Sequence, residues 1–476
     1  MRELFGTDGI RAVAGEYPLD ERTVYAIGRA LAHHLSTPGT RKNGPNRQAT
    51  QVAPSAQPSV VIGQDTRESG RWIATALARG LLAEGVSVSS AGVLTTPGIA
   101  FLARTQGFAA GIVVSASHNP WRDNGIKIFG PDGYKLPDGV EVEIEKEIFI
   151  RLAEPVPNDA IAPLPATMML GDPELRRAYQ EWLVKSVAGT DISRFRVLVD
   201  CANGAAAPIA QAVFHRCGVH AVLLNDVPDG RNINDQCGAL YPEAVATAVR
   251  RTNSESRQPR FSMGITFDGD ADRALFSDAD GNIVNGDAIL LLSARAMKQR
   301  GVLKHNTVVA TTMSNMGLEI ALRASGIRML RAPVGDKYVL EEMHRTGATL
   351  GGEQSGHIIF RDGDSTTGDG LLTALRVMAK MARARQELRE LVSDMKVFPQ
   401  VIRNVRVRDK QPLEQLDEVA AAIRQAEAEL NGTGRLVVRY SGTEPLLRVM
   451  VEAESEQKMN QLADMVSAAV QRTLGT

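Results

Sequence analysis

The chain has 476 residues, enough for about three or four domains of ordinary size. Hydrophobic residues make up 43% and charged residues 23%, the balance of a globular protein with a sizeable core. With 54 Lys and Arg against 55 Asp and Glu, the net charge of −1 excludes an overall field that would attract nucleic acid or an anionic membrane. No stretch approaches the run of about 18 apolar residues that spans a membrane, and the N-terminal segment has no apolar signal-like core. The three cysteines lack CxxC spacing, so we expect reduced thiols in a cytoplasmic protein with no nucleic-acid or membrane partner.

A short β-branched run, a small polar loop and a helix-like stretch follow one another at three places, 60–82, 197–218 and 308–326. Short apolar strands that alternate with amphipathic helices are typical of βαβ units. The pattern therefore predicts three related α/β domains. The polar stretch 36–59 ahead of the first copy contains proline and has no periodicity, so we expect a surface loop or a disordered insertion.

The first domain contains a short apolar run, 112–114, that ends abruptly in Ser-Ala-Ser-His-Asn-Pro. Ligands of open α/β sheets bind beyond the carboxyl ends of strands, which is where Ser115 and Ser117 lie. Pro120 donates no N–H and pushes Asn119 toward an extended conformation, so the loop is expected to stay open at the surface.

Lys127 follows shortly after, where it can reach back as a cation or a proton donor. A hydrolase triad would need a histidine beside the serine hydroxyl. Ser117 and His118 are adjacent, however, so their side chains diverge on an extended chain, and no G-x-S-x-G turn is present. The better hypothesis is that Ser117 accepts and donates a phosphoryl group while facing a metal ion.

The segment 153–167 carries four prolines and is typical of a linker between domains. Asp172 and Pro173 then predict the start of a helix, with Asp as the N-cap and Pro at the first helical position.

Further along, TFDGDADRALF places Asp268, Asp270 and Asp272 at alternating positions after an apolar-leaning segment. Their side chains can converge from one turn. Three carboxylates at such short separation repel one another and need a compensating cation. Oxygen ligands of this kind suit Mg²⁺ acting on a phosphate. An EF-hand calcium loop is excluded because its sixth position requires glycine, and this chain has Arg273 there. The alternative interpretation is a solvated acidic turn.

In the third domain GGEQSGHIIF places Glu353, Ser355 and His357 between glycines. Alternating polar side chains with glycines between them suit a ligand with several hydroxyl groups. The alternative is a tight glycine turn with no ligand.

The segment 395–409 changes from helix-like to strand-like and introduces a mixed arrangement of strands and helices, which predicts a smaller α+β domain. Within it, RYSGTEPLLRV brings hydroxyls, unhindered N–H groups and two guanidinium groups around one turn. These groups suit one phosphate monoester, although Ser-Gly-Thr is also ordinary hairpin chemistry. The residues of this predicted phosphate clamp are Arg439, Ser441, Gly442, Thr443 and Arg448.

The predicted domains are 1–166 with the serine loop, 167–282 with the acidic loop, 283–394 with the GEQSGH loop, and 395–476 with the clamp.

Five motifs in this order resemble the signatures of the α-D-phosphohexomutases. They are FGTDGIR, SASHNP with NGIK, DGDADR, GEQSGH and RYSGTEP, and they extend over nearly the whole chain. Within the family, Gln354 and the stretch 232–238 are similar to the members that act on hexosamine phosphates. The resemblance implies three α/β domains with mixed sheets and a smaller α+β domain, arranged as a heart-shaped molecule.

The resemblance also implies a role for each motif. Ser117 would be the phosphoserine and, with the three aspartates, a ligand of one Mg²⁺ ion. Lys127, Arg11 and His118 would act beside the reacting phosphoryl group. The substrate-binding residues would be Arg273, Glu353, Ser355, His357, Arg439, Ser441, Gly442, Thr443 and Arg448.

The implied activity is interconversion of the 6- and 1-phosphates of glucosamine through a 1,6-bisphosphate, on the route to UDP-N-acetylglucosamine. A phosphomannomutase or phosphoglucomutase is the alternative among enzymes. A catalytically inactive sugar-phosphate binding protein is the alternative from another class, against which the intact Ser117, aspartates and Lys127 argue. A homodimer is compatible with the resemblance.

Overall fold

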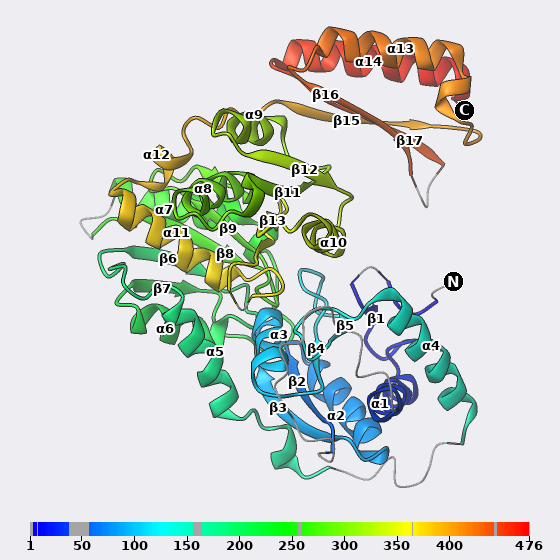
Figure 1. Cartoon of the computed structure of the whole chain (residues 1–476), viewed down its shortest axis with the longest axis vertical. Coiled ribbons are helices and arrows are strands. Elements are labelled where there is room, and N and C mark those ends of the chain that lie inside the picture. Colours follow the sequence, from blue (N-terminus) through cyan, green and yellow to red (C-terminus); the bar gives the residue numbers. More distant parts are fainter. Residues whose placement is uncertain are drawn as a thin grey trace. The chain divides into compact units, whose positions relative to one another are not determined.

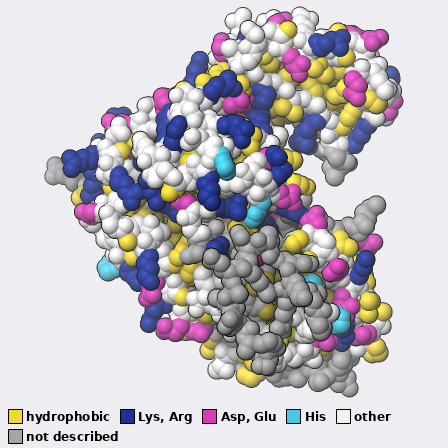
Figure 2. Space-filling view, viewed as in Figure 1, with side chains coloured by type: hydrophobic (Ala, Val, Ile, Leu, Met, Phe, Trp, Pro, Cys, Tyr) yellow, Lys and Arg dark blue, Asp and Glu magenta, His cyan; other side chains and the backbone are white. Residues whose placement is uncertain are grey.

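The structure, a computed structural model, describes residues 3–6, 8–37, 57–155, 164–255, 259–363, 365–441 and 445–475 (Figure 1). The chain forms two compact units, one of Met1–Met313 with Met329–Val392 and one of Ser314–Arg328 with Ser393–Thr476. Within the described ranges, every helix is too short or too polar to cross a lipid bilayer. Basic and acidic side chains are interspersed over the face seen in Figure 2, in keeping with the net charge of −1.

The first unit begins with a five-stranded sheet in the order β1-β5-β4-β2-β3. Strand β2 is parallel to β3 and β4, whereas β5 is antiparallel to β4 and β1 to β5, so the sheet is mixed. Its strands are β1 (Ile10–Val13), β2 (Ser59–Gln64), β3 (Ser87–Val93), β4 (Ala110–Val114) and β5 (Asp123–Phe129). Its helices are α1 (Glu21–Ser36), α2 (Gly70–Ala83), α3 (Thr96–Thr105) and α4 (Asp138–Ala153).

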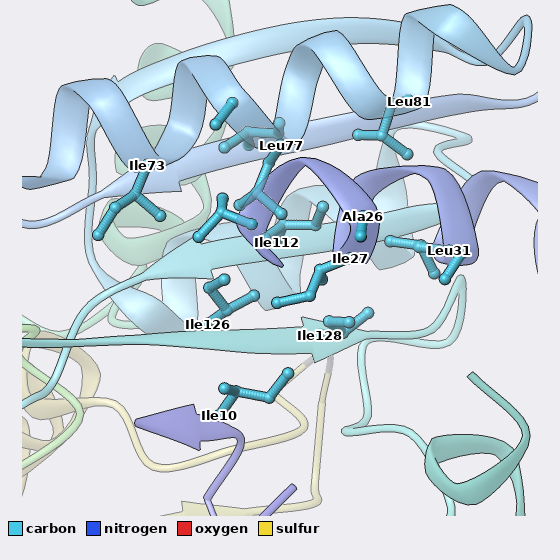
Figure 3. Close-up of a cluster of buried hydrophobic side chains, with 14 of the residues drawn as sticks. Ile10, Ala26, Ile27, Leu31, Ile73, Leu77, Leu81, Ile112, Ile126 and Ile128 are labelled. Carbon is cyan, nitrogen blue, oxygen red and sulfur yellow. The ribbon is translucent and has the colours of Figure 1, made fainter. Parts of the chain in front are cut away.

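Strand β4 lies in the core of this sheet. Ile27 of α1 and Leu77 of α2 pack with Ile112 of β4 in one cluster of fully buried side chains (Figure 3). On the other face, Ile99 of α3 lies so close that a Cβ atom at Gly111 would be 3.0 Å from it. Strand β4 is therefore covered on both faces, as its unbroken apolar sequence predicts.

The second sheet has the order β10-β9-β8-β6-β7 and is again mixed, because β6 is parallel to β7 and β8 while β9 is antiparallel to β8. Its strands are β6 (Arg196–Asp200), β7 (His220–Leu224), β8 (Met263–Phe267), β9 (Ala274–Ser277) and β10 (Ile283–Val284). Its helices are α5 (Pro173–Lys185), α6 (Ala207–Arg216) and α7 (Pro242–Glu255). Strand β10 lies just beyond residue 282, so this sheet extends slightly past the predicted end of the second domain.

Two local predictions in this part of the chain can be compared with the structure. Helix α5 begins at Pro173, and the Asp172 carboxylate accepts a hydrogen bond from the backbone N–H of Glu174, as expected for an N-cap. The cysteines are free thiols, and burial raises the pKa of each above its ordinary value, which disfavours the reactive thiolate form.

The third sheet has the order β12-β11-β13-β14, with β11 parallel to β13 and β13 antiparallel to β14. Its strands are β11 (Thr307–Thr311), β12 (Arg328–Ala332), β13 (Leu350–Gly352) and β14 (Ile358–Phe360). The helices of this part of the first unit are α8 (Gly286–Gln299), α10 (Asp336–Thr346), α11 (Gly370–Ala384) and α12 (Leu388–Val392).

The second unit is a smaller α+β fold with an antiparallel sheet in the order β15-β17-β16. Its elements are β15 (Gln400–Arg406), β16 (Arg435–Tyr440), β17 (Leu446–Glu452), α9 (Met316–Ala324), α13 (Asp417–Leu430) and α14 (Glu456–Leu474). Val449 and Val451 of β17 pack against Leu462 and Val466 of α14 in a separate buried cluster. The predicted α+β character of the C-terminal region is confirmed.

The three predicted strand–loop–helix repeats are present as β2–α2, β6–α6 and β11–α9. The third copy differs in one respect, because α9 packs within the C-terminal unit rather than with the sheet that contains β11. The insertion predicted at 36–59 falls between α1 and β2, and its residues 38–56 lie outside the described part of the chain, as do 156–163 of the predicted linker.

Candidate active site

Ser117 lies just beyond the carboxyl end of β4, as the sequence predicts, but it is not at the surface. Its side chain is 2% exposed, and its backbone is left-handed with φ of 53°. The expectation that Ser117 itself lies at the surface is therefore wrong, whereas Pro120, three residues further along the loop, is exposed. The buried stretch that begins in β4 continues through Ser115 and Ala116 to Ser117.

Two side chains approach the Ser117 hydroxyl. Ser117 Oγ donates a hydrogen bond of 2.5 Å to Asp268 Oδ2, on the loop after β8. His118 Nδ1 lies 3.4 Å from the same oxygen, so the expectation that the side chains of Ser117 and His118 diverge is also wrong. The left-handed backbone at Ser117 reverses the chain, whereas the expectation assumed an extended one.

The acidic triad converges as its spacing predicts. Asp268, Asp270 and Asp272 are buried, and one oxygen from each lies within 4.8 Å of the others. Within the described part of the chain, Oδ1 of Asp270 and Oδ1 of Asp272 have no hydrogen-bond partner. Hard oxygen donors that are buried and unpaired fit a divalent cation such as Mg²⁺.

The charges of the triad are not balanced among themselves. Burial, followed by the charges of Asp272 and Asp270, raises the pKa of Asp268 well above its ordinary value. Burial alone would also raise the pKa of Asp270, but the ammonium of Lys127 and a hydrogen bond from Thr96 hold it below its usual range. A cation among these carboxylates would offset the repulsion that, after burial, raises the pKa of Asp268.

Lys127 on β5 is the buried cation of the site. Its Nζ lies 2.9 Å from Asp270 Oδ2, 3.2 Å from Asp8 Oδ2 and 3.7 Å from Asp272 Oδ2. Burial opposes its charge, but these three carboxylates raise the pKa of Lys127 above its ordinary value, so it is protonated at neutral pH. Arg11 reaches the same cluster through an ion pair with Asp8.

Several contacts of the site were not predicted from the sequence. Thr96 Oγ1, at the start of α3, donates a 2.6 Å hydrogen bond to Asp270 Oδ2. Lys135 pairs with Asp8 and, at 2.5 Å, with Asp336 at the start of α10. Asp336 follows the end of β12, which is a position where ligands are expected, but Thr96 and Lys135 carry no comparable signal.

The GEQSGH motif forms the turn of the β13–β14 hairpin. His357 Nε2 lies 3.9 Å from Asp272 Oδ2 and 3.8 Å from Asp336 Oδ2. Among the described residues, no hydrogen-bond partner exists for either ring nitrogen of His357 or for Ser355 Oγ, although all three atoms are buried. Glu353 Oε1 accepts a 3.1 Å hydrogen bond from Gly335 N, which connects this turn to the start of α10. Unpaired buried polar atoms at the end of a hairpin are suited to a hydroxylated ligand.

Arg273 directly follows the triad, and its backbone N–H donates to Asp268 Oδ1 at 3.1 Å. Its Nε lies 3.8 Å from Asp272 Oδ1, so the guanidinium group lies beside the carboxylates.

The predicted clamp lies in the C-terminal unit. Arg439 on β16 and Arg448 on β17 are direct cross-strand partners, and Ser441 follows β16 in a buried position. Gly442 and Thr443 lie outside the described residues. The clamp as a binding site stays a prediction.

A buried tyrosine–aspartate pair near the site leads to a stability prediction. Tyr179 Oη donates a 2.8 Å hydrogen bond to Asp369 Oδ2, and burial raises the pKa of Asp369 to about 6. The hydroxyl stabilises the ionised carboxylate, so its loss matters most above that pKa. Tyr179→Phe should lower the free energy of unfolding by about 1–3 kcal/mol near pH 8 and by less near pH 5.

Urea unfolding of both proteins at the two pH values measures this difference. Tyr241→Phe, at an exposed position, is the control for loss of a tyrosine hydroxyl. Equal destabilisation by Tyr179→Phe at both pH values would show that the Asp369 charge is not involved.

Three mixed α/β sheets, an α+β unit, and a buried serine beside three carboxylates and a lysine are the arrangement expected of a phosphoryl-transfer enzyme.

The comparisons with known proteins identify the family. Models of phosphoglucomutase/phosphomannomutase alpha/beta/alpha domains I, II and III match residues 2–153, 177–281 and 285–398, and the model of the C-terminal domain matches 403–469. The chain belongs to the phosphoglucomutase/phosphomannomutase family.

Its relatives include phosphoglucosamine mutases that match over their full length. The one from Koribacter versatilis is 61% identical over 100% of this chain and 98% of that protein. The one from Solibacter usitatus is 48% identical over 100% of this chain and 99% of that protein.

Two solved structures share the fold. A phosphoglucomutase/phosphomannomutase family protein from Burkholderia thailandensis has a TM-score of 0.74 at 24% identity, covering 99% of this chain and 98% of that chain. Aspergillus fumigatus N-acetylphosphoglucosamine mutase, in complex with GlcNAc-6P and magnesium, has a TM-score of 0.63 at 20% identity, covering 100% and 96%.

Proposed function

We propose that the protein interconverts glucosamine 6-phosphate and glucosamine 1-phosphate through a phosphorylated Ser117. The observation that carries this proposal is the hydrogen bond between the buried Ser117 hydroxyl and Asp268 of the acidic triad. The full-length similarity to phosphoglucosamine mutases supports the choice of substrate.

The proposed reaction has two phosphoryl transfers. In the first, the bond between the Ser117 oxygen and phosphorus breaks, and the free hydroxyl of the monophosphate bonds to phosphorus and loses its proton. The sugar then carries phosphate at both C1 and C6. In the second transfer the other phosphate returns to Ser117, and the sugar regains a proton and leaves with its phosphate at the alternative position.

Charged residues around Ser117 can neutralise charge during these steps. Lys127, protonated and buried, lies against the triad and can neutralise the transferring phosphoryl group. Arg11 is held by Asp8 in the same cluster. Burial and the charges of Arg273 and Arg11 lower the pKa of His118 to about 4, so its imidazole is neutral at pH 7 and only a weak base there.

The triad fits one Mg²⁺ ion, with Asp268, Asp270, Asp272 and the phosphorylated Ser117 as the ligands we propose. Bound there, the ion would neutralise charge on the phosphoryl oxygens. The magnesium in the solved structure of the Aspergillus fumigatus mutase is consistent with this choice of ion.

The turn of the β13–β14 hairpin is the proposed sugar-binding element. Glu353, Ser355 and His357 offer acceptors and donors for the sugar hydroxyls. The guanidinium group of Arg273 interacts electrostatically with the carboxylates of the triad and with Glu353 of this turn. Sugar hydroxyls would satisfy the buried atoms of Ser355 and His357 that have no partner in the described structure.

The choice of substrate is tested with glucosamine, glucose and mannose 6-phosphates under identical conditions. We expect glucosamine 6-phosphate to have the highest kcat/KM. If glucose or mannose 6-phosphate is preferred by a wide margin, the protein is a phosphoglucomutase or phosphomannomutase instead.

The predicted clamp is tested with Arg439→Ala. Loss of a charged donor to a phosphate dianion should weaken the binding of both monophosphates by about 1.5–3 kcal/mol and release more of the bisphosphate intermediate. Forward and reverse kinetics with the released bisphosphate quantified provide the measurement, and Arg424→Ala on helix α13 provides the control. A defect toward one monophosphate alone would contradict a clamp shared by both half-reactions.

A further inference from the structure

Arg67 is a buried arginine to which the proposed reaction assigns no role. It is 2% exposed and follows β2, next to the loop that carries Ser117. Its Nε donates a 2.9 Å hydrogen bond to Asp65 Oδ2, and its backbone N–H donates a 3.0 Å bond to Asp65 Oδ1. The cation is therefore neutralised by Asp65 and is not available as a counter-charge for a ligand.

The remaining donors of the guanidinium group point to backbone carbonyls of the serine loop. Nη2 donates to the carbonyl oxygens of Ser117 at 3.0 Å and Asn119 at 2.8 Å. Nη1 donates to the carbonyl oxygen of Asp123 at 3.0 Å and also to that of Pro120. A planar guanidinium can serve these four carbonyls at once, whereas a lysine ammonium has three donors and no fixed fork.

Asp65 holds the same loop from its other side. Ser115 Oγ donates a 2.7 Å hydrogen bond to Asp65 Oδ2 and accepts a 2.9 Å bond from the backbone N–H of Ser117. The N–H of Ser117 is thus fixed through Ser115, and its carbonyl accepts hydrogen bonds from Arg67 Nη2 and, at 2.9 Å, from Asn234 Nδ2.

This double anchoring occurs at a residue whose backbone conformation is unfavourable. Ser117 has φ of 53°, a region that residues with a Cβ atom avoid unless the surroundings determine it. In this conformation its Oγ reaches Asp268 Oδ2 at 2.5 Å. The backbone of Gly269 packs against the Ser117 carbonyl, since a Cβ atom there would lie 2.5 Å from that oxygen. A relaxed loop would therefore move the hydroxyl away from the triad.

We propose that Arg67, with Asp65 and Ser115, is a positioning residue that holds Ser117 in the left-handed conformation needed for phosphoryl transfer. Arg67 does not touch the reacting atoms; it acts through the loop backbone. The inference rests on the proposed function, because it assumes that Ser117 is the group that carries the phosphate.

Arg67→Lys tests this role because it keeps the charge opposite Asp65 and removes the fork. The protein is freed of phosphate, mixed with glucose 1,6-bisphosphate as the phosphoryl donor, and the appearance of phosphoserine is followed by intact mass in a single turnover. A misplaced nucleophile should slow this step about 10- to 100-fold, while the KM for the monophosphate stays within about twofold. The ³¹P resonance of the phosphorylated variant should broaden or split, because the loop samples more than one conformation.

Controls separate positioning from stability. Arg79→Lys on α2 changes a distant arginine that pairs with Glu21 and should leave the rate unchanged. Ile73→Val removes a methyl group from the buried hydrophobic cluster of the first sheet and is the control for loss of stability. If Ile73→Val loses as much rate as Arg67→Lys for an equal fall in unfolding midpoint, the loss of rate reflects stability alone and the positioning role is wrong.

Ser115→Ala removes the second anchor and replaces Arg67→Lys as the test if the latter does not fold. It should slow phosphoryl transfer with the same pattern. A folded Arg67→Lys or Ser115→Ala protein with the parent's rate and a single sharp ³¹P line overturns the inference. Failure of the parent itself to accept phosphate on Ser117 would instead contradict the proposed function.

Discussion

Ser117→Ala is expected to abolish mutase activity, with kcat reduced by about 10⁴-fold or more, as when a catalytic nucleophile is removed. The hydroxyl is the proposed phosphoryl carrier and donates to Asp268 at 2.5 Å. No other described hydroxyl occupies that position. Stability should change by only about 1 kcal/mol, the ordinary contribution of one hydrogen bond.

Three measurements define the outcome: turnover of glucosamine 6-phosphate, intact mass after incubation with glucose 1,6-bisphosphate, and the unfolding midpoint. Ser277→Ala is the matched control, since this serine is buried in β9 and its Oγ has no hydrogen-bond partner among the described residues. Near-normal turnover of Ser117→Ala, or phosphate on a different residue, would show that another group carries the phosphoryl group.

Local features of this chain are predictable from its sequence because they depend on residues close together. The strand–helix repeats at 60–82, 197–218 and 308–326 follow from the alternation of β-branched runs and amphipathic stretches. The convergence of Asp268, Asp270 and Asp272 follows from their spacing on one turn.

The rest of the site depends on contacts that spacing cannot reveal. Asp8 meets Lys127 because β1 pairs with β5 in the first sheet, and Thr96 meets Asp270 because the first and second sheets come together within the first unit. The burial of Ser117 and its closeness to His118 depend on a left-handed backbone angle. That angle is set by Arg67, which precedes the loop by about fifty residues, so the local sequence alone predicted an extended chain.

Removal of divalent metal is expected to stop turnover. Asp270→Asn should weaken the metal site and lower kcat by about 10²- to 10³-fold. Metal affinity should also fall as the pH falls. Burial and the neighbouring charges of Asp272 and Asp270 raise the pKa of Asp268, so protons compete with the ion for this carboxylate. Dialysis against a chelator, followed by titration with Mg²⁺ at several pH values, measures both effects.

Asp270→Asn has a second consequence that distinguishes the structure from a simple acidic turn. The Asp270 carboxylate is 2.9 Å from the buried Lys127 ammonium, which would lose its nearest counter-charge. Breaking a buried ion pair costs about 3–5 kcal/mol, so the unfolding midpoint should fall together with activity. Asp278→Asn is the control, because this buried carboxylate lies on the neighbouring turn and caps backbone N–H groups without meeting the triad. Full activity in excess chelator would reduce the triad to an acidic turn, and an unchanged unfolding midpoint for Asp270→Asn would mean that Lys127 does not depend on it.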